Sequence, residues 1–156
     1  ENVKSYMEIQ QIRNQSLFDY EIDCQVDALD TYVLKLILQP LVENAVKYGF
    51  QDIFEGGRIK ITVWKEGDNL YLSVSNNGTP VECAMMDKIN GMNSLAVSER
   101  KNCFPDKKRG YGVVNILTRL RLKYGDGAGF YCEAHEEGTT CTIKIPGGGG
   151  LRENEK

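Results

Sequence analysis

One face of a predicted helix gathers the side chains with the most chemical potential in this sequence. Residues 34–49 have helical periodicity, and at about 100° per residue Glu43, Asn44, Lys47 and Tyr48 fall within an arc of about 140°, opposite the apolar residues. The pattern has two interpretations. The face is either a solvated surface with an ordinary Glu43–Lys47 pair, or one wall of a binding site.

A second stretch places two glycines directly before another predicted helix, at Gly110-Tyr111-Gly112. Without side chains, an anion can approach the backbone N–H groups at the positive end of the helix dipole. Glycines also cap helices for purely structural reasons. The motif alone therefore leaves a phosphate site and a helix cap both open.

A third stretch, VSNNGTP at residues 74–80, puts a side-chain amide and a glycine at the end of a predicted strand. Such residues can present polar groups to a ligand. They are equally common in turns, because asparagine and glycine tolerate turn conformations. This stretch alone therefore does not distinguish a ligand-binding site from a turn.

The elements that must position these stretches are helices and strands without regular alternation. A helix is expected at the start of the chain, a strand at 17–23, and a helix at 34–49 that Gly49 ends in a left-handed conformation and that Pro40 disturbs. Residues 58–64 and 69–75 alternate in phase around the turn EGD, which predicts a hairpin with one buried face.

The second half of the sequence continues this mixture. Residues 79–109 have weak periodicity and predict a partly helical, mobile lid; residues 112–124 predict a helix, followed by the strands FYCEA and TCTIKI. Hairpins favour a mixed sheet over a parallel one. The expected fold class is α/β, a two-layer sandwich of a mixed sheet packed against helices.

Length and composition exclude several classes of protein. The 156 residues fit one domain, 41% are hydrophobic and 26% charged, and no window resembles a membrane span or a secretory signal. A net charge of −3 argues against nucleic-acid binding. The five cysteines have no CxxC spacing and are interpreted as reduced structural thiols. A cytoplasmic chain without membrane contact is expected.

Taken together, the three stretches resemble one family. LQPLVENAVKYG is similar to the N box, SNNGTP to the first glycine box, GYGVVNILTRLRLKYG to the second, and GTTCTIKIP to the last strand, of the GHKL ATPases. Within this superfamily the sequence most resembles the catalytic domains of LytS-type sensor histidine kinases, from residue 6 to residue 146. The resemblance implies the Bergerat ATP-binding fold.

The resemblance also implies roles for individual residues toward ATP and Mg²⁺. Asn44 matches the asparagine that coordinates Mg²⁺, which prefers oxygen ligands. Glu43 matches the acidic residue that acts as a general base on the nucleophile. Lys47 is expected to neutralise phosphate charge, and Tyr48 to lie against adenine.

Further nucleotide contacts are implied by the glycine boxes and the last strand. Thr139 matches the threonine that closes the adenine side of the site through water. The other expected ATP-binding residues are Gly78, Gly110, Tyr111, Gly112 and Val113.

The first glycine box departs from the family pattern DxGxG at two positions. Asn76 stands where an adenine-reading aspartate is expected, and Pro80 replaces the second glycine. A carboxylate only accepts hydrogen bonds, whereas an amide also donates. Adenine binding is expected to survive with less selectivity.

The expected function is the ATP-binding catalytic domain of a two-component sensor histidine kinase, which transfers the γ-phosphate to a histidine on an upstream dimerisation segment. The only histidine, His135, is near the end of a predicted strand and is not the acceptor. Expected divisions are an upstream helical end at 1–16, the catalytic domain at 17–146 and a flexible tail at 147–156. A response regulator is the indirect partner, and the parent is expected to be anchored in the bacterial inner membrane.

Two other functions fit the same residues. An ATPase or serine kinase would share the fold and the metal-binding asparagine. A regulatory module that binds nucleotide without transferring phosphate would explain the altered first glycine box.

Overall fold

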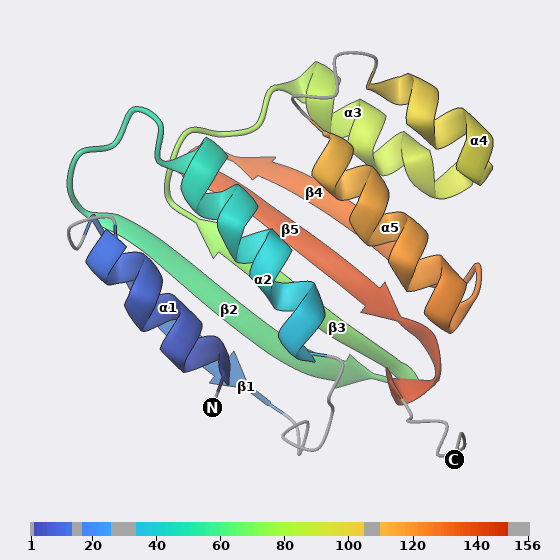
Figure 1. Ribbon diagram of the computed structural model, residues 1–156, viewed down its shortest axis with the longest axis horizontal. Coiled ribbons are helices and arrows are strands. Elements are labelled where there is room, and N and C mark those ends of the chain that lie inside the picture. The colour runs from blue at the N-terminus through green and yellow to red at the C-terminus, as the bar shows by residue number, and fades with distance from the viewer. Residues whose placement is uncertain (1, 14–16, 26–33, 105–109, 150–156) are drawn as a thin grey trace.

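A mixed five-stranded sheet forms one layer of the molecule. The computed structural model describes residues 2–13, 17–25, 34–104 and 110–149. The strand order is β1-β2-β3-β5-β4, with β1 parallel to β2 and the other neighbours antiparallel (Figure 1). The strands are β1 (Phe18–Cys24), β2 (Gly57–Glu66), β3 (Asn69–Asn76), β4 (Gly129–His135) and β5 (Gly138–Ile145).

Helices cover one face of this sheet and form the second layer (Figure 1). The α-helices are α1 (Asn2–Arg13), α2 (Leu34–Asn44), α3 (Cys83–Gly91), α4 (Val97–Arg100) and α5 (Tyr111–Tyr124). The other helical turns are η2 (Ala45–Gly49), η3 (Met92–Ser94), η4 (Lys101–Cys103) and η5 (Pro146–Gly149). The α/β two-layer sandwich expected from the sequence is confirmed. No helix among the described residues is long and apolar enough to cross a membrane.

The core lies between the helices and the inner face of the sheet. Alternate residues of the β2–β3 hairpin are almost fully buried there, which confirms the predicted hairpin with one buried face: Ile59, Ile61, Val63, Leu70, Leu72 and Val74. Gly67 makes the turn at a φ of 57°, which glycine adopts without steric cost. Burying each of these side chains contributes about 1.5–3 kcal/mol before entropy is counted.

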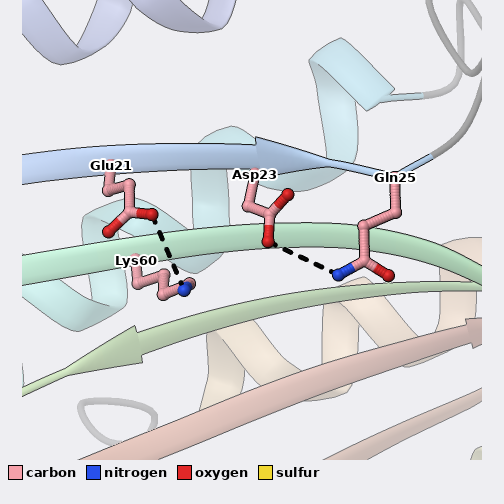
Figure 2. Close-up of polar contacts among 4 residues, drawn as sticks. All are labelled: Glu21, Asp23, Gln25 and Lys60. Carbon is pink, nitrogen blue, oxygen red and sulfur yellow. Dashed lines mark hydrogen bonds and ion pairs between the residues drawn. The ribbon is translucent and has the colours of Figure 1, made fainter.

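The opposite face of the sheet is polar where β1 and β2 meet. Glu21 and Lys60 are register partners, and the Lys60 Nζ lies 3.6 Å from the Glu21 Oε1 (Figure 2). The Gln25 amide donates to Asp23 at 3.4 Å on the same surface. Exposed ion pairs contribute about 1 kcal/mol or less. The ion pair on this face therefore adds little to the stability of the sheet.

Helix α1 belongs to the same hydrophobic core as the rest of the chain. Met7 is fully buried, and the Gln11 side chain donates to the carbonyl of Phe18 at 2.9 Å. Helix α1 also contacts α2. The helix predicted at the start of the chain is confirmed, while the domain boundary at residue 16 stays a prediction.

Two asparagines of the segment after β3 cover the edge of the sheet. Strand β4 is an edge strand, and Asn90 makes hydrogen bonds to both the N–H and the C=O of Cys132, at 2.8 and 2.9 Å. Asn93 does the same for Phe130, at 3.0 and 2.7 Å. These amides replace the missing neighbour strand, which satisfies backbone groups that an open edge would expose.

The partly helical character predicted for residues 79–109 is confirmed by α3, α4 and the turns beside them. The predicted mobility of this lid stays a prediction, and its residues 105–109 lie outside the described part of the chain. Of the predicted tail, residues 147–149 belong to the turn η5, and residues 150–156 also lie outside the described part.

Candidate functional site

A cavity of about 200 Å³ lies on the helix side of the sheet, bounded by α2, η2, α3, the start of α5 and the inner face of strands β3, β4 and β5. Helices α2 and α5 lie next to one another across the sheet (Figure 1). The residues that line the cavity are Leu41, Asn44, Ala45, Tyr48, Gly49, Gln51, Val74, Asn76, Thr79, Pro80, Val81, Glu82, Met85, Ile89, Gly110, Gly112, Val113, Phe130, Cys132, Thr139 and Cys141.

The N-terminus of α5 forms one end of the cavity. Gly110 is its N-cap and has a φ of 84°, which favours glycine. A side chain at this position would also overlap the Phe104 ring, which is a second reason for glycine here. A Cβ atom on Gly112 would lie 3.8 Å from the Asn44 Oδ1. The amide of Asn44 therefore faces the first turn of α5, whose N–H groups have no partner within the helix. This end suits an anion and an oxygen-bound cation.

Helix α2 continues into a π-helical turn that carries two residues of the predicted polar face. Residues Ala45–Gly49 form this turn, which advances by a smaller angle per residue than an α-helix. Tyr48 lines the cavity with Asn44, whereas Lys47 is exposed outside it, with its Nζ 5.1 Å from the Tyr48 ring centroid. The α-helical periodicity of the sequence does not predict this π turn.

Gly49 corrects one sequence prediction. Its φ is not positive, so the expected left-handed helix end is wrong. Glycine is needed here because a Cβ atom would lie 2.7 Å from the Asn76 Oδ1, too close for any real contact. The requirement comes from a loop 27 positions later in the chain, which local helix rules cannot detect.

The loop after β3 interlocks with this helix end. The Asn76 Oδ1 accepts from the Gly78 N–H at 3.0 Å, and the Gly49 carbonyl accepts from the Thr79 N–H at 2.8 Å. A side chain on Gly78 would overlap the Gly49 carbonyl. Asn77 holds the other side of the loop. Its amide oxygen accepts from the Arg58 N–H at 2.6 Å, and its amide nitrogen donates to the Gly56 C=O at 3.0 Å. Hydrogen bonds thus hold this loop on both sides, and its residues Asn76 and Thr79 line the cavity.

Thr139 stands opposite Asn76 on the neighbouring strand. The two residues are register partners of β3 and β5, and both line the cavity. The Thr139 Oγ1 is buried and accepts from the Val81 N–H at 2.9 Å. Its own proton is left to donate. An amide and a hydroxyl thus lie side by side at this end of the cavity.

Glu43 lies outside the cavity, on the side of α2 that faces α1. Its Oε1 accepts from the Tyr6 hydroxyl and from the Gln39 amide, each at 3.2 Å. Burial, the charge of Glu43 and this hydrogen bond together raise the pKa of Tyr6 above its usual value. The phenol therefore stays protonated and keeps donating to the carboxylate through the neutral range.

Seven predicted site residues come together in the cavity: Asn44, Tyr48, Asn76, Gly110, Gly112, Val113 and Thr139. Four do not line it: Glu43, Lys47, Gly78 and Tyr111. Gly78 is buried beneath Gly49, and Tyr111 is 39% exposed at the start of α5. His135 is exposed at the end of β4, outside the cavity, with its Nε2 3.1 Å from the Thr140 hydroxyl.

The apolar wall of the cavity was missed by the sequence analysis. Met85 and Ile89 come from α3, and Phe130, Cys132 and Cys141 from β4 and β5. Alternation in the strand FYCEA places Phe130 and Cys132 on one face, which is a signal that could have found them. The spacing of the cysteines in the sequence predicts only structural thiols at these two positions.

Comparison with known proteins identifies relatives over most of the chain. Residues 30–148 match the family described as histidine kinase-, DNA gyrase B- and HSP90-like ATPase. The sensor protein LytS of Streptococcus mutans is 30% identical over 146 residues, 93% of this chain and 23% of LytS. The sensor histidine kinase YesM of Bacillus subtilis is 28% identical over 145 residues, 92% of this chain and 22% of YesM. The chain thus spans less than a quarter of these relatives.

Solved structures share the fold. The catalytic domain of histidine kinase ThkA superposes with a TM-score of 0.65 at 24% identity, covering 93% of this chain and 88% of that one. A structure of ThkA in complex with the response regulator protein TrrA gives a TM-score of 0.62 at 21% identity, covering 96% of this chain and 40% of that one.

Proposed function

Because this chain belongs to the histidine kinase-, DNA gyrase B- and HSP90-like ATPase family, as an ATP-binding catalytic domain of the sensor histidine kinase type, we propose that it transfers the γ-phosphate of ATP to a histidine on an upstream dimerisation segment of its parent protein. The observation that carries the proposal is the Asn44 amide beside the first turn of α5. An oxygen ligand and free backbone donors at one point match a metal-bound triphosphate.

The phosphate end of the cavity would hold the triphosphate and Mg²⁺. Among the described residues, no group of three or more His, Cys, Asp or Glu side chains could hold a metal ion. A Mg²⁺ ion at the Asn44 Oδ1 would therefore take its other ligands from phosphate oxygens and water, which is how Mg²⁺ usually accompanies nucleotides. The metal would neutralise charge on the phosphates. The N–H groups of Tyr111, Gly112 and Val113 would donate to phosphate oxygens.

The base end of the cavity would hold adenine. Asn76 and Thr139 supply an amide and a hydroxyl there, and Val74, Ile89 and Phe130 supply apolar surface. A planar base between apolar walls with two polar groups at its edge is a common arrangement for small ligands. Tyr48 lines the same cavity and is proposed to lie against the base.

Glu43 is proposed to act on the nucleophile and not on ATP. Its carboxylate lies outside the cavity, on the side of α2 that faces α1, and we propose that a histidine delivered by another segment arrives there. It would accept the N–H proton of that imidazole as the nitrogen–phosphorus bond forms and the bond to the ADP oxygen breaks. Lys47, exposed on the same helix, would lower the negative charge that the nucleophile approaches.

The partners proposed are ATP, the upstream acceptor helices and, indirectly, a response regulator. His135 is exposed outside the cavity on the domain itself, so the acceptor is proposed to be a different histidine. The solved complex of ThkA with TrrA supports a response regulator as the kind of protein that such a kinase meets. A cytoplasmic location for this domain and a membrane anchor in the parent are proposed from the resemblance to sensor histidine kinases.

Two measurements on one preparation test the proposal. Calorimetric titration with ATP is expected to show binding that depends on Mg²⁺, and labelled ATP is expected to transfer phosphate to the acceptor segment of the parent protein. Binding without transfer would instead support a regulatory module. Release of inorganic phosphate without a labelled acceptor would support an ATPase.

A further inference from the structure

Two cysteines face each other in the wall of the cavity. Cys132 of β4 and Cys141 of β5 are register partners, and their Sγ atoms lie 2.8 Å apart. Neither these nor the other three cysteines form a disulfide. Cβ atoms of opposed residues in antiparallel strands are about 4.5–5.5 Å apart, and a disulfide needs about 3.5–4.5 Å. The two thiols can therefore join with a small approach of the strands.

The same two thiols are reached through the cavity. Both residues line it, and Cys132 is only 6% exposed while Cys141 is half-buried. The hydrogen bond with Cys141, together with burial, raises the pKa of Cys132. Because thiolates and not thiols attack oxidants, the more exposed Cys141 is the sulfur that reacts first. Cys132 is then already in contact with the oxidised sulfur.

The strands that carry the thiols are held firmly by their surroundings. Asn90 bonds both backbone groups of Cys132, and Thr139, two residues before Cys141, is bonded by the Val81 N–H. A partner thiol fixed within contact distance favours an intramolecular disulfide over further oxidation of one sulfur. Disulfides in reducing compartments are mostly transient or redox-sensing, which suits a reversible pair.

We infer that Cys132 and Cys141 form a peroxide-sensitive dithiol in the nucleotide cavity, which closes to an intramolecular disulfide when the cavity is empty and is shielded when nucleotide is bound. The shielding rests on the proposed function; the closure does not. Cys141 attacks hydrogen peroxide, its sulfur gains one oxygen as sulfenic acid, and one water leaves. The Cys132 sulfur then displaces that oxygen, which leaves as a second water with the remaining thiol proton. Two thiols are oxidised and one peroxide is reduced.

The closure is tested in a chain where only this pair remains, with Cys24→Ser, Cys83→Ser and Cys103→Ser. Hydrogen peroxide is expected to give a monomer whose intact mass has lost two hydrogen atoms, restored by a reductant. The matched variant with Cys141→Ala added is expected to lack this product. Stepwise gain of oxygen atoms without loss of hydrogen, or disulfide-linked dimers only, would overturn the inference. Circular dichroism of each variant checks that it is folded.

The shielding is tested by following closure with and without ATP and Mg²⁺. If nucleotide covers the pair, ATP at 100 times its Kd is expected to slow closure about 100-fold, in proportion to the empty fraction. If calorimetry shows that ATP is bound but the rate of disulfide closure is unchanged, the inferred shielding is wrong. If the reduced protein forms the Cys132–Cys141 disulfide but binds no ATP, the proposed function is refuted while the inference of a peroxide-sensitive dithiol is supported.

Discussion

The two ends of the cavity are built in opposite ways. At the proposed base end, the polar atoms already have protein partners: the Asn76 Oδ1 accepts from Gly78 and the Thr139 Oγ1 accepts from Val81. At the proposed phosphate end, the Asn44 amide faces the N–H groups that begin α5, which have no acceptor within the helix. One end is preorganised by the protein, and we propose that the ligand completes the other.

This difference indicates which property each end controls. Groups held by neighbours keep their geometry before binding, so we expect the proposed base end to control selectivity, because a wrong edge would meet fixed polar atoms. Groups that await a ligand gain most of their interaction on binding, so we expect the proposed phosphate end to control affinity and dependence on the metal. Substitutions at the base end should therefore change selectivity between nucleotides, whereas substitutions at the phosphate end should change ATP affinity and its dependence on Mg²⁺.

The largest effect is expected at the phosphate end, for Asn44→Ala. Losing the oxygen ligand should abolish Mg²⁺-dependent ATP binding while the fold stays intact, because Asn44 is only half-buried and lines the cavity. Calorimetry with ATP, with Mg²⁺ or with a chelator, measures this. The matched change Asn102→Ala removes an exposed amide outside the cavity and should leave binding unaltered. Wild-type affinity in the Asn44 variant would remove the metal assignment.

At the base end, Gly78→Ala should cost stability first. The new methyl group would overlap the Gly49 carbonyl, and a backbone atom cannot move aside cheaply. We expect a loss of about 3 kcal/mol in the free energy of unfolding and a corresponding loss of ATP binding.

Urea denaturation measures this loss, and Gly91→Ala is the matched control. Gly91 ends α3, and nothing lies within 4 Å of a Cβ atom built there. That variant should be as stable as the wild type or more stable, by up to about 1 kcal/mol. Equal stability of the two variants would show that the interlocked wall is not rigid.

Glu43→Gln tests a residue that belongs to neither end. If the carboxylate acts on the nucleophile, phosphate transfer should slow about 100-fold while ATP affinity is unchanged. The amide can still accept from the Tyr6 hydroxyl, so the contact with α1 is kept. Glu21→Gln on the exposed face of β1 is the matched control and should change neither quantity. Losses of affinity and rate in equal measure would contradict the proposed base.

The sequence predicted what depends on local pattern. Strict alternation located the β2–β3 hairpin, and the glycine pair located the start of α5. Only the family resemblance placed that start in one site with Asn44. The local pattern failed where distant segments set the requirement. A Cβ atom on Gly49 would meet the Asn76 amide, which lies 27 positions later in the chain, and the π turn at Ala45–Gly49 is not predicted by the α-helical periodicity of the sequence.

Segments with weak periodicity were the least predictable. Helix α3 buries Ile89 in the core, and the amides of Asn90 and of Asn93 in η3 also attach this segment to the edge of β4. Polar side chains that replace a strand leave no hydrophobic period to detect. The pairing of Cys132 with Cys141 likewise depends on strand register, which spacing along the chain does not show.

The smallest effect is expected for Asn76→Asp, and it tests selectivity at the preorganised end. The Gly78 N–H requires an oxygen, so flipping the Asn76 amide would forfeit that hydrogen bond. The unflipped amide offers its Nδ2 donor to guanine O6 and a second Oδ1 lone pair to adenine N6, so it discriminates weakly. An aspartate keeps the bond from Gly78, accepts more strongly from adenine and repels guanine O6. The variant should bind ATP tighter by about 1 kcal/mol, roughly fivefold, and reject GTP. Titrating both nucleotides against both proteins, with Asn102→Asp as the charge control, measures this. A wild type that already excludes GTP as strongly as the variant would show that Asn76 does not contact the edge of the base.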